Sequence, residues 1–256
     1  MTVVTHVPSP ALQDCELTFL DSEPINLVKA AREHADYCRM LELCGARVVK
    51  LEENRSLADS VFVEDPIIVF DETAVLTSMG IESRRKEGEA LAAFFRTQRK
   101  IERIALPAKI EGGDVLKVGR RVYVGISPRT NKSGIKALKD IIHPFGYETI
   151  PVRVNGCLHL KTGCTALDEE TLLINRDWVD ITPFNGFRII ETLPEEPFGA
   201  NVLPIEDTVC MNEAFPGTIT LVRSLGYMVR STDISEFVKA EAGLTCMSIP
   251  FLSNHV

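Results

Sequence analysis

The chain has 256 residues, of which 45% are hydrophobic and 25% charged, an ordinary composition for a globular protein with a sizeable core. Its 28 basic and 36 acidic side chains give a net charge of -8, and no basic cluster is long enough to neutralise a nucleic-acid backbone. We therefore expect no nucleic-acid partner. A secretion signal and an apolar run of membrane-spanning length are both missing, which predicts a cytoplasmic protein with no membrane contact.

The seven cysteines argue against a disulfide framework, because their number is odd and they are widely scattered. No CxxC pair occurs, so the usual spacing of a structural zinc site is missing too. A free thiol is most often a small buried apolar side chain. Cys246, in the run "GLTCMSI" near the end of the chain, raises the question of whether its thiol does chemistry instead.

A recurring order of elements starts in the first third of the chain. Residues 60–77 alternate in polarity as two strands that turn at Asp71 and Glu72, residues 83–99 read as an amphipathic helix, and residues 101–106 as a strand. No Pro/Gly/Ser-rich linker interrupts the chain, which predicts a single domain over residues 1–256.

The same order returns in the next segment. Residues 112–127 predict two strands turning at Gly119 and Arg120, residues 131–146 a helix that ends at a glycine, and residues 147–152 a strand. The repeating unit is therefore strand, strand, helix, strand.

Two further copies follow. Residues 158–175 and 187–193 supply the strands of a third, with a weakly marked helix expected around Trp178. Residues 200–212 predict the two strands of a fourth, which continues through a helix and a strand, residues 217–226 and 227–234.

The fifth copy is incomplete at the C-terminus, where only ten residues follow Cys246. The N-terminus can complete it with a strand in residues 3–10, a helix in residues 23–45 and a strand in residues 46–52. Five units would then close into a ring.

One polar or reactive residue stands at the start of the first strand of each unit, at intervals of 42 to 49 residues. Such a period is typical of repeat architectures, and propeller blades have this length. In a ring the first strands point at a common axis, where these side chains would converge. The alternative is a coincidental spacing of polar residues at strand ends. The five are Asp65, Asp114, His159, Asn201 and Cys246.

The thiol and the imidazole are the candidate reactive pair. A nucleophilic cysteine needs a lowered pKa or a nearby base, because the thiolate is the reactive form. His159 is the natural base for Cys246, although a single histidine in a strand is more often structural.

Carboxylates are the third component. Asp59, Glu64 and Asp65 lie close together in "SLADSVFVEDP", where they could hold a planar cation by paired hydrogen bonds. For Asp59 and Glu64 taken singly, surface solvation is the simpler explanation. Glu111 precedes a glycine pair and could orient an imidazole or bind a cation, while Asp114 could equally cap a turn.

Two arginines occupy matching places in the first and second units, after the second strand and at the entrance to the helix. Arg84 lies in "ESRRKEG" and Arg129 in "SPRTNKSG". The carboxylate of an amino acid is a fitting ligand for such a pair.

Six motifs together resemble one family. "SVFVEDP", "ESRRKEG", "GGDVLKVG", "SPRTN", "LHLKTG" and "LTCMS", in this order and spacing, are similar to the dimethylarginine dimethylaminohydrolases of the guanidine-modifying (pentein) superfamily. The resemblance implies a five-bladed, pseudo-symmetric α/β propeller around a central cavity. It also implies hydrolysis of Nω-methylated arginine (dimethylarginine or monomethylarginine) to citrulline and an alkylamine, through a covalent thiouronium intermediate on cysteine.

The resemblance also implies roles for nine residues. Cys246 resembles the nucleophile, His159 the general acid and base, and Glu111 the carboxylate that supports this histidine. The substrate-binding residues implied are Asp59, Glu64 and Asp65 around the guanidinium, Arg84 and Arg129 on the α-carboxylate, and Leu17, which contacts the α-amino group through its backbone. No metal and no cofactor are implied.

Other functions remain open on the residues alone. Ser78 and Met79 stand where the family is expected to have Arg-Pro, which leaves the substrate open: a deiminase or amidinotransferase acting on arginine or another guanidine is the alternative. A protein that binds such ligands without turnover is another. Zinc on Cys157, His159, Cys164 and Cys246 is a third, and inhibitory zinc at Cys246 and His159 is conceivable.

The expected partner is a small guanidine-containing substrate. A homodimer is favoured by general assembly statistics alone.

Overall fold

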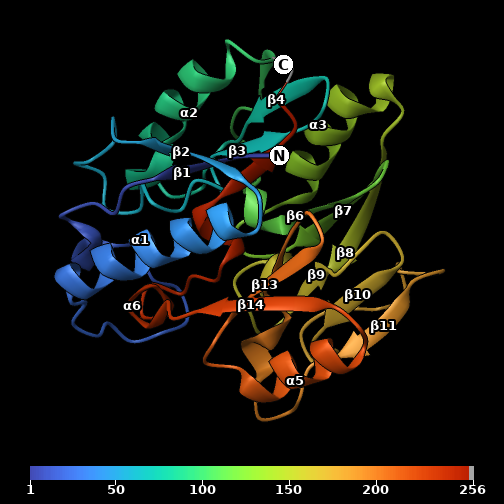
Figure 1. Ribbon diagram of the computed structural model, residues 1–256. Coiled ribbons are helices and arrows are strands. Elements are labelled where there is room, and N and C mark those ends of the chain that lie inside the picture. The colour runs from blue at the N-terminus through green and yellow to red at the C-terminus, as the bar shows by residue number, and fades with distance from the viewer. Residues whose placement is uncertain (254–256) are drawn as a thin grey trace.

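The strands of the protein form five small sheets around a common centre (Figure 1). The computed structural model describes residues 1–253, and within them each sheet has three strands. The sheets are β3 (Ile67–Val69), β4 (Thr73–Leu76) and β5 (Lys100–Arg103); β6 (Val115–Val118), β7 (Arg121–Ile126) and β8 (Glu148–Arg153); β9 (Cys164–Ala166), β10 (Thr171–Ile174) and β11 (Arg188–Glu191); β12 (Leu203–Ile205), β13 (Thr208–Asn212) and β14 (Met228–Thr232); and β15 (Ile249–Phe251), β1 (Thr2–His6) and β2 (Arg47–Leu51).

Every sheet has the same pairing pattern. The first strand pairs antiparallel with the second, and the second pairs parallel with the third. A parallel pair needs a crossover connection, which is where the helices lie. The expected five-unit propeller is confirmed, with the N-terminal β1 set between β15 and β2 to complete the fifth unit.

Four helices fill these crossovers: α1 (Leu27–Leu43), α2 (Gly88–Phe95), α3 (Lys132–Ile142) and α5 (Pro216–Ser224). In α3 the sequence explains both ends and the buried face. Asn131 caps its N-terminus by accepting a hydrogen bond from the Gly134 amide at 2.8 Å, and Gly146 stops the following turn with a φ of 82°. Ile135, Leu138 and Ile142 then point into the core at helical spacing. Within the described residues no helix is both long and apolar enough to cross a bilayer.

The third unit departs from the prediction. The helix expected around Trp178 is absent, and turns occupy the crossover between β10 and β11. Pro183 and Gly186, the latter with a φ of 92°, interrupt any helical pattern there. The indole of Trp178 instead packs on the Phe198 ring, with a centroid distance of 4.8 Å.

The hydrophobic core is divided into five clusters, and each cluster is shared by two neighbouring units. For example, Val75 of the first unit packs in the same cluster as Val124 of the second. The fifth unit joins the first through Ile249 and Ile67. No unit covers its apolar faces alone, so the ring is stabilised by packing between units.

The segments that precede the first strands are tied to one another around the axis. The Glu64 amide donates to the Cys246 carbonyl at 3.2 Å, which joins the first unit to the fifth. The other four junctions are equally short. They are Gly112 N to Asp65 O at 3.0 Å, Leu160 N to Asp114 Oδ1 at 2.9 Å, Asn201 Nδ2 to Lys161 O at 2.8 Å, and Thr245 N to Asn201 Oδ1 at 3.2 Å.

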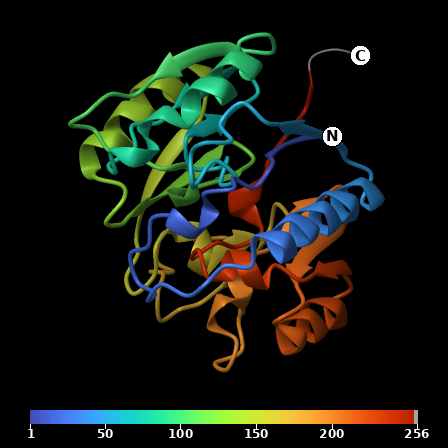
Figure 2. The ribbon, with the colours of Figure 1, turned by 90° about the vertical axis from the view of Figure 1, so that its left-hand side faces the viewer.

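This closed set of hydrogen bonds defines the hub of the propeller. The first strands of all five sheets also line a cavity of about 280 Å³, through residues such as Ile67, Leu116, Thr165, Leu203 and Ile249. A second view shows the same arrangement from the side, with α1 lying against the last units (Figure 2). Side chains far apart in sequence are therefore fixed close together at the hub.

Candidate active site

The candidate reactive residues lie in short connecting segments at the hub, just before the first strands. His159 was expected in a strand, but it caps the short helix α4 (Leu160–Gly163), which precedes β9. Cys246 lies in the 3-10 turn η6 (Thr245–Met247), which precedes β15. The strands themselves are only three residues long in these units, so the reactive residues fall outside them.

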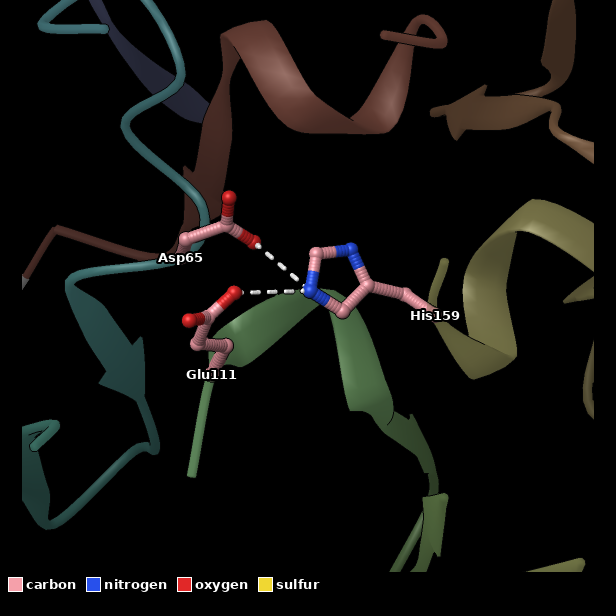
Figure 3. A group of neighbouring side chains, drawn as sticks. All are labelled: Asp65, Glu111 and His159. Carbon is pink, nitrogen blue, oxygen red and sulfur yellow. Dashed lines mark hydrogen bonds and ion pairs between the residues drawn. The ribbon is translucent and has the colours of Figure 1, made fainter. Parts of the chain in front are cut away.

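The imidazole of His159 is held by two carboxylates. Figure 3 shows that Asp65, Glu111 and His159 project into one space from three separate segments, with the other ring nitrogen turned away from both acids. Nε2 lies 2.9 Å from Glu111 Oε2 and 3.9 Å from Asp65 Oδ1. All three side chains are buried, Glu111 completely. Solvent screening between them is therefore weak.

These neighbours keep His159 protonated at neutral pH. Burial alone would lower the pKa of the imidazole, but the charge of Asp65 and the hydrogen bond to Glu111 outweigh it and raise this pKa to about 9. Burial alone would raise the pKa of Asp65, but the charges of His159 and Arg84 outweigh it and hold this pKa below its usual value. The pair is therefore an imidazolium beside carboxylates, with a proton available for transfer.

A glycine makes room for this pair. A Cβ at Gly113 would lie 2.6 Å from His159 Nδ1 and 2.9 Å from Asp65 Oδ1, and the Gly113 amide donates to the same Asp65 oxygen at 3.1 Å. The glycine pair after Glu111 therefore serves the close approach that its sequence suggested.

Gly113→Ala is expected to displace the imidazole and lower kcat about tenfold or more, because an ångström of misplacement is enough for such losses. Steady-state kinetics would measure the loss. Gly119→Ala is the matched control, since nothing lies within 4 Å of a Cβ there; its φ of 58° costs stability but leaves the hub untouched. Equal loss of kcat in both variants would contradict this explanation.

Cys246 lies beside the acidic side of the hub. Burial, and then the charges of Glu64 and Asp65, raise the pKa of its thiol to about 12. The Gly243 amide donates toward the sulfur at 3.4 Å, which favours the thiolate only in part. The protein's own groups therefore hold a neutral thiol at neutral pH, and a positive charge placed between it and the carboxylates would lower its pKa.

Glu64 is paired at the hub with a lysine. Its carboxylate accepts hydrogen bonds from Lys161 Nζ and, at 2.8 Å, from Thr245 Oγ1. Burial raises the pKa of Glu64, and Lys161 opposes this shift. The surface solvation considered for Glu64 is therefore wrong, because the side chain is enclosed and ion-paired.

Asp59 is likewise buried and not solvated. Both carboxylate oxygens lie 3.3 Å from the Glu16 amide, and Oδ1 lies 3.9 Å from Arg84 Nε. Burial raises the pKa of Asp59 to about 6, although Arg84 opposes the shift. Asp59 therefore joins the hub to the segment that follows β1.

Arg84 lies in the 3-10 turn η2 (Ser83–Lys86) and is fully engaged with acids. Its Nη1 donates to Asp65 Oδ2 at 3.0 Å and its Nη2 to Glu87 Oε2 at 3.0 Å. Burial, opposed by Arg84, raises the pKa of Glu87 to about 7. A ligand carboxylate reaching Arg84 would compete with these two partners.

Arg129 links the hub to the segment after β1. Nη1 lies 3.4 Å from Glu111 Oε1, and Nη2 donates to Thr18 Oγ1 at 2.7 Å. Leu17, the expected contact for the α-amino group, is the half-buried neighbour of Thr18. The two arginines thus both contact the carboxylates that surround His159.

The cysteine-rich zinc alternative has no support in this geometry. Cys157 and Cys164 lie in the apolar cluster between the second and third units. Burial raises the pKa of both thiols, that of Cys157 to about 12, which disfavours the thiolate that a metal needs. Within residues 1–253, the donors that lie within 4.8 Å of one another are those of Asp65, Glu111 and His159. His159 is protonated there, and Asp65 and Glu111 also contact arginines. The two carboxylates are therefore paired with cationic side chains of the protein, which suits them less to a metal ion.

Sequence reasoning missed three residues of this network: Lys161, Glu87 and Thr245. Each lies inside a motif that was singled out, within three residues of a residue that was chosen. Asp114, for which a turn cap was the alternative, instead joins two units at the hub: it accepts from Ser127 Oγ at 2.6 Å and from the Leu160 amide of the third unit. Counting the carboxylates and seeking a cation for each would have pointed to Lys161.

Comparison with known proteins finds relatives that match nearly the whole chain. A family model described as "N,N dimethylarginine dimethylhydrolase, eukaryotic" matches residues 16–180. The N(G),N(G)-dimethylarginine dimethylaminohydrolase of Pseudomonas aeruginosa is 35% identical over 251 residues, covering 97% of this chain and 98% of the relative. A solved structure of the P. aeruginosa enzyme, a cysteine-to-serine variant complexed with citrulline, has a TM-score of 0.92 at 34% identity and covers 98% of both chains.

A second solved structure is an adduct of a histidine-to-glycine variant of dimethylarginine dimethylaminohydrolase with S-methyl-L-thiocitrulline. It also has a TM-score of 0.92 at 34% identity, covering 98% of this chain and 99% of its own. Fold and sequence are both similar along nearly the whole chain. The chain belongs to the dimethylarginine dimethylaminohydrolase family.

Proposed function

We propose that the protein hydrolyses Nω-methylated arginine to citrulline and an alkylamine through a covalent intermediate on Cys246. The observation that carries this proposal is the charge pattern at the hub, where a protonated His159 and a neutral Cys246 thiol adjoin several buried carboxylates. A guanidinium cation bound beside the thiol would balance the negative charge of these carboxylates. Membership of the family, in which a relative is complexed with citrulline, supports the same substrate class.

Binding would place the guanidinium against the acidic side of the hub. Asp59 and Asp65 are buried, and Glu64 is only slightly exposed. Asp65 and Glu64 also pair with Arg84 and Lys161. Planar carboxylates match a guanidinium by paired hydrogen bonds. At the other end of the substrate, Arg84 and Arg129 would bind the α-carboxylate, and the Leu17 backbone would accept from the α-amino group.

Substrate binding would also activate the nucleophile. The charges of Glu64 and Asp65 oppose ionisation of Cys246, and a guanidinium cation between them and the sulfur offsets that effect. The thiol proton then leaves to solvent, because His159 already carries its own. The thiolate attacks the guanidinium carbon to give a tetrahedral intermediate.

The charge state of His159 suits the next two steps. The imidazolium donates its proton to the leaving alkylamine nitrogen, the C–N bond breaks, and a thiouronium remains on Cys246. The neutral imidazole then takes a proton from water as the oxygen attacks the same carbon. The C–S bond then breaks with its electron pair on sulfur, the hydroxyl releases its remaining proton to solvent, and the carbonyl of citrulline forms as the thiolate is regenerated. Glu111 stabilises the cationic form of the ring in both steps.

Product analysis tests this proposal against the alternative substrate. Incubation of the purified protein with dimethylarginine is expected to release citrulline and dimethylamine in equal amounts, both measurable by chromatography. Arginine, which would release ammonia, is expected to react at least about tenfold more slowly in kcat/KM, since a pocket that accommodates two methyl groups gains their burial. Faster release of ammonia from arginine would identify a deiminase, and no citrulline from either would refute the enzyme proposal.

A further inference from the structure

A carboxylate holds the tip of the segment that follows β1. The amides of Thr18, Phe19 and Leu20 all donate to the side chain of Glu241, at 3.0 Å for Thr18 and 2.6 Å for Leu20. We call residues 16–24 the lid loop. Three consecutive amides converging on one carboxylate form a compact anion-binding nest, so the tip has one defined position. The carboxylate comes from the turn after α6 (Ser235–Val238).

Glu241 adopts a backbone conformation that suits glycine. Its φ is 59°, and within residues 1–253 only Glu206 among the other non-glycine residues has a positive φ. Such a conformation costs free energy for a residue with a Cβ, so its presence points to a role of the side chain. Two residues further on, the Gly243 amide donates toward the sulfur of Cys246. The carboxylate thus fixes the lid tip to the nucleophile's own segment.

The lid tip is also bonded to the acid–base side of the hub. Thr18 Oγ1 accepts from Arg129 Nη2 at 2.7 Å, Arg129 Nη1 lies 3.4 Å from Glu111, and Glu111 contacts His159. One loop therefore connects both halves of the reactive pair. Glu241 connects it to the segment of Cys246, and Thr18 connects it to the partner of His159.

The base of the lid loop is fixed independently of its tip. Gln13 bridges the loop end by donating to the Glu23 carbonyl at 3.3 Å and accepting from the Ile25 amide at 2.6 Å. Lys239 Nζ donates to the Pro24 carbonyl at 3.0 Å. Removing a contact at the tip should consequently change the tip position without releasing the whole loop.

The tip also forms one wall of a cavity. Phe19 and Leu20 line a mostly apolar space of about 300 Å³ together with Glu241, Gly243 and Leu244. Phe19 and Leu20 are each more than 40% exposed, so burial of their side chains contributes little to holding the tip in place. The hydrogen bonds to Glu241 are therefore the principal contacts that keep the tip against the nucleophile's segment.

We propose that Glu241 and Thr18 are positioning residues for the reaction, acting through the lid loop on substrate affinity and on the acid–base pair respectively. The inference rests on the proposed hydrolysis of a guanidine substrate. Glu241 sets the fraction of molecules whose lid tip is in the binding position, and apparent affinity falls with that fraction. Thr18 orients Arg129 on Glu111, so its loss acts on the chemical step through Glu111, in addition to any effect on binding through Arg129.

Glu241→Gly tests the first role, because glycine relieves the strained φ while removing the carboxylate. KM for dimethylarginine is expected to rise about tenfold with kcat changed less than about threefold, since the lid tip then populates its binding position less. Thermal stability should not fall. Glu206→Gly is the matched control: it relieves a φ of 49° in the turn between β12 and β13, remote from the lid, and should leave KM unchanged.

An unchanged KM in Glu241→Gly, or a fall in kcat with KM unaltered, would overturn the role of Glu241. Amide hydrogen exchange provides a readout that does not depend on turnover. The peptide containing Thr18, Phe19 and Leu20 is expected to exchange faster in Glu241→Gly than in the wild type. Equal exchange would show that Glu241 does not hold the lid tip.

Thr18→Val and Thr18→Ser test the second role. Valine keeps the shape but cannot accept from Arg129, and kcat is expected to fall about fivefold, the value of one such hydrogen bond. Serine keeps the hydroxyl and should restore kcat to within about twofold of the wild type. Equal kcat for valine and serine would overturn this role. If the wild type forms no citrulline at all, the proposed function fails. The exchange measurement would still show whether Glu241 holds the lid tip.

Discussion

Cys246→Ser is expected to abolish turnover, with kcat lowered on the order of 10⁴-fold or more, because a serine hydroxyl ionises far less readily than a thiol and cannot form the thiouronium. Substrate binding should persist, since the carboxylates and arginines of the hub do not involve the sulfur. Mass spectrometry of wild-type enzyme quenched during turnover should find the amidino adduct on the peptide that contains Cys246. The serine variant should lack it.

Cys15→Ser is the matched control for this experiment. Among the seven free cysteines, Cys15 and Cys246 are the two that are partly exposed, so both changes introduce a hydroxyl at a similar depth. Burial and the nearby charge of Asp59 raise the pKa of Cys15 to about 11, so its thiol is neutral at neutral pH. Its variant should keep kcat within about threefold, as expected for a half-exposed substitution. Undiminished turnover in Cys246→Ser would leave a different nucleophile or a different reaction.

The ring could be predicted from the sequence because two independent patterns agree. Alternating strands meet at turns such as Asp71–Glu72 and Gly119–Arg120, which the structure places between β3 and β4 and between β6 and β7. The interval of 42 to 49 residues then implies that every unit needs a neighbour. The shared core clusters are the physical counterpart of that interval.

The sequence could not decide which acid would take which cation. Asp59, Glu64, Asp65 and Glu87 are all close to the hub, and differences of an ångström place Arg84 on Asp65 and Glu87 and leave Asp59 at 3.9 Å. Such choices depend on the relative position of segments that are far apart in sequence. The contact of Glu241 with the lid tip, across more than 200 residues, has the same origin.

Two further differences have local causes. The helix expected at Trp178 is lost because Pro183 and Gly186 break the pattern, and a single indole packs the space instead. Ser78, which departs from the family motif, forms an isolated bridge with Ile110 between the first two units and is buried there. Ser78 therefore lies where the first two units contact each other. The single domain, the homodimer and the cytoplasmic location stay predictions.

The charge balance at the hub explains why a buried histidine can serve as an acid. An isolated buried imidazole would be neutral at neutral pH, as His34 is, whose pKa burial lowers to about 4. His159 is buried to the same degree, yet its pKa is about 9, because Asp65 and Glu111 face its ring. The difference between the two histidines is the presence of carboxylates.

Glu111→Gln should therefore change both the size and the pH dependence of kcat. The amide keeps a hydrogen-bond acceptor for Nε2 but removes the negative charge, so the imidazolium loses stabilisation and its pKa falls below about 9. At any pH between about 6.5 and about 9, a smaller fraction of His159 then carries the proton that the leaving amine needs. We expect kcat to fall about hundredfold, the lower range for loss of acid catalysis, and its basic limb to move to lower pH.

The pH profile of kcat, measured for the wild type and the variant, checks both effects. Glu72→Gln is the control: it removes a carboxylate that Arg120 contacts at 2.6 Å in the turn between β3 and β4, at the outer end of the first unit. Its basic limb should coincide with that of the wild type. A shift of the basic limb of Glu111→Gln to higher pH would contradict this explanation. It would mean that Glu111 stabilises the neutral form of the titrating group, whereas a carboxylate beside His159 should stabilise the protonated form.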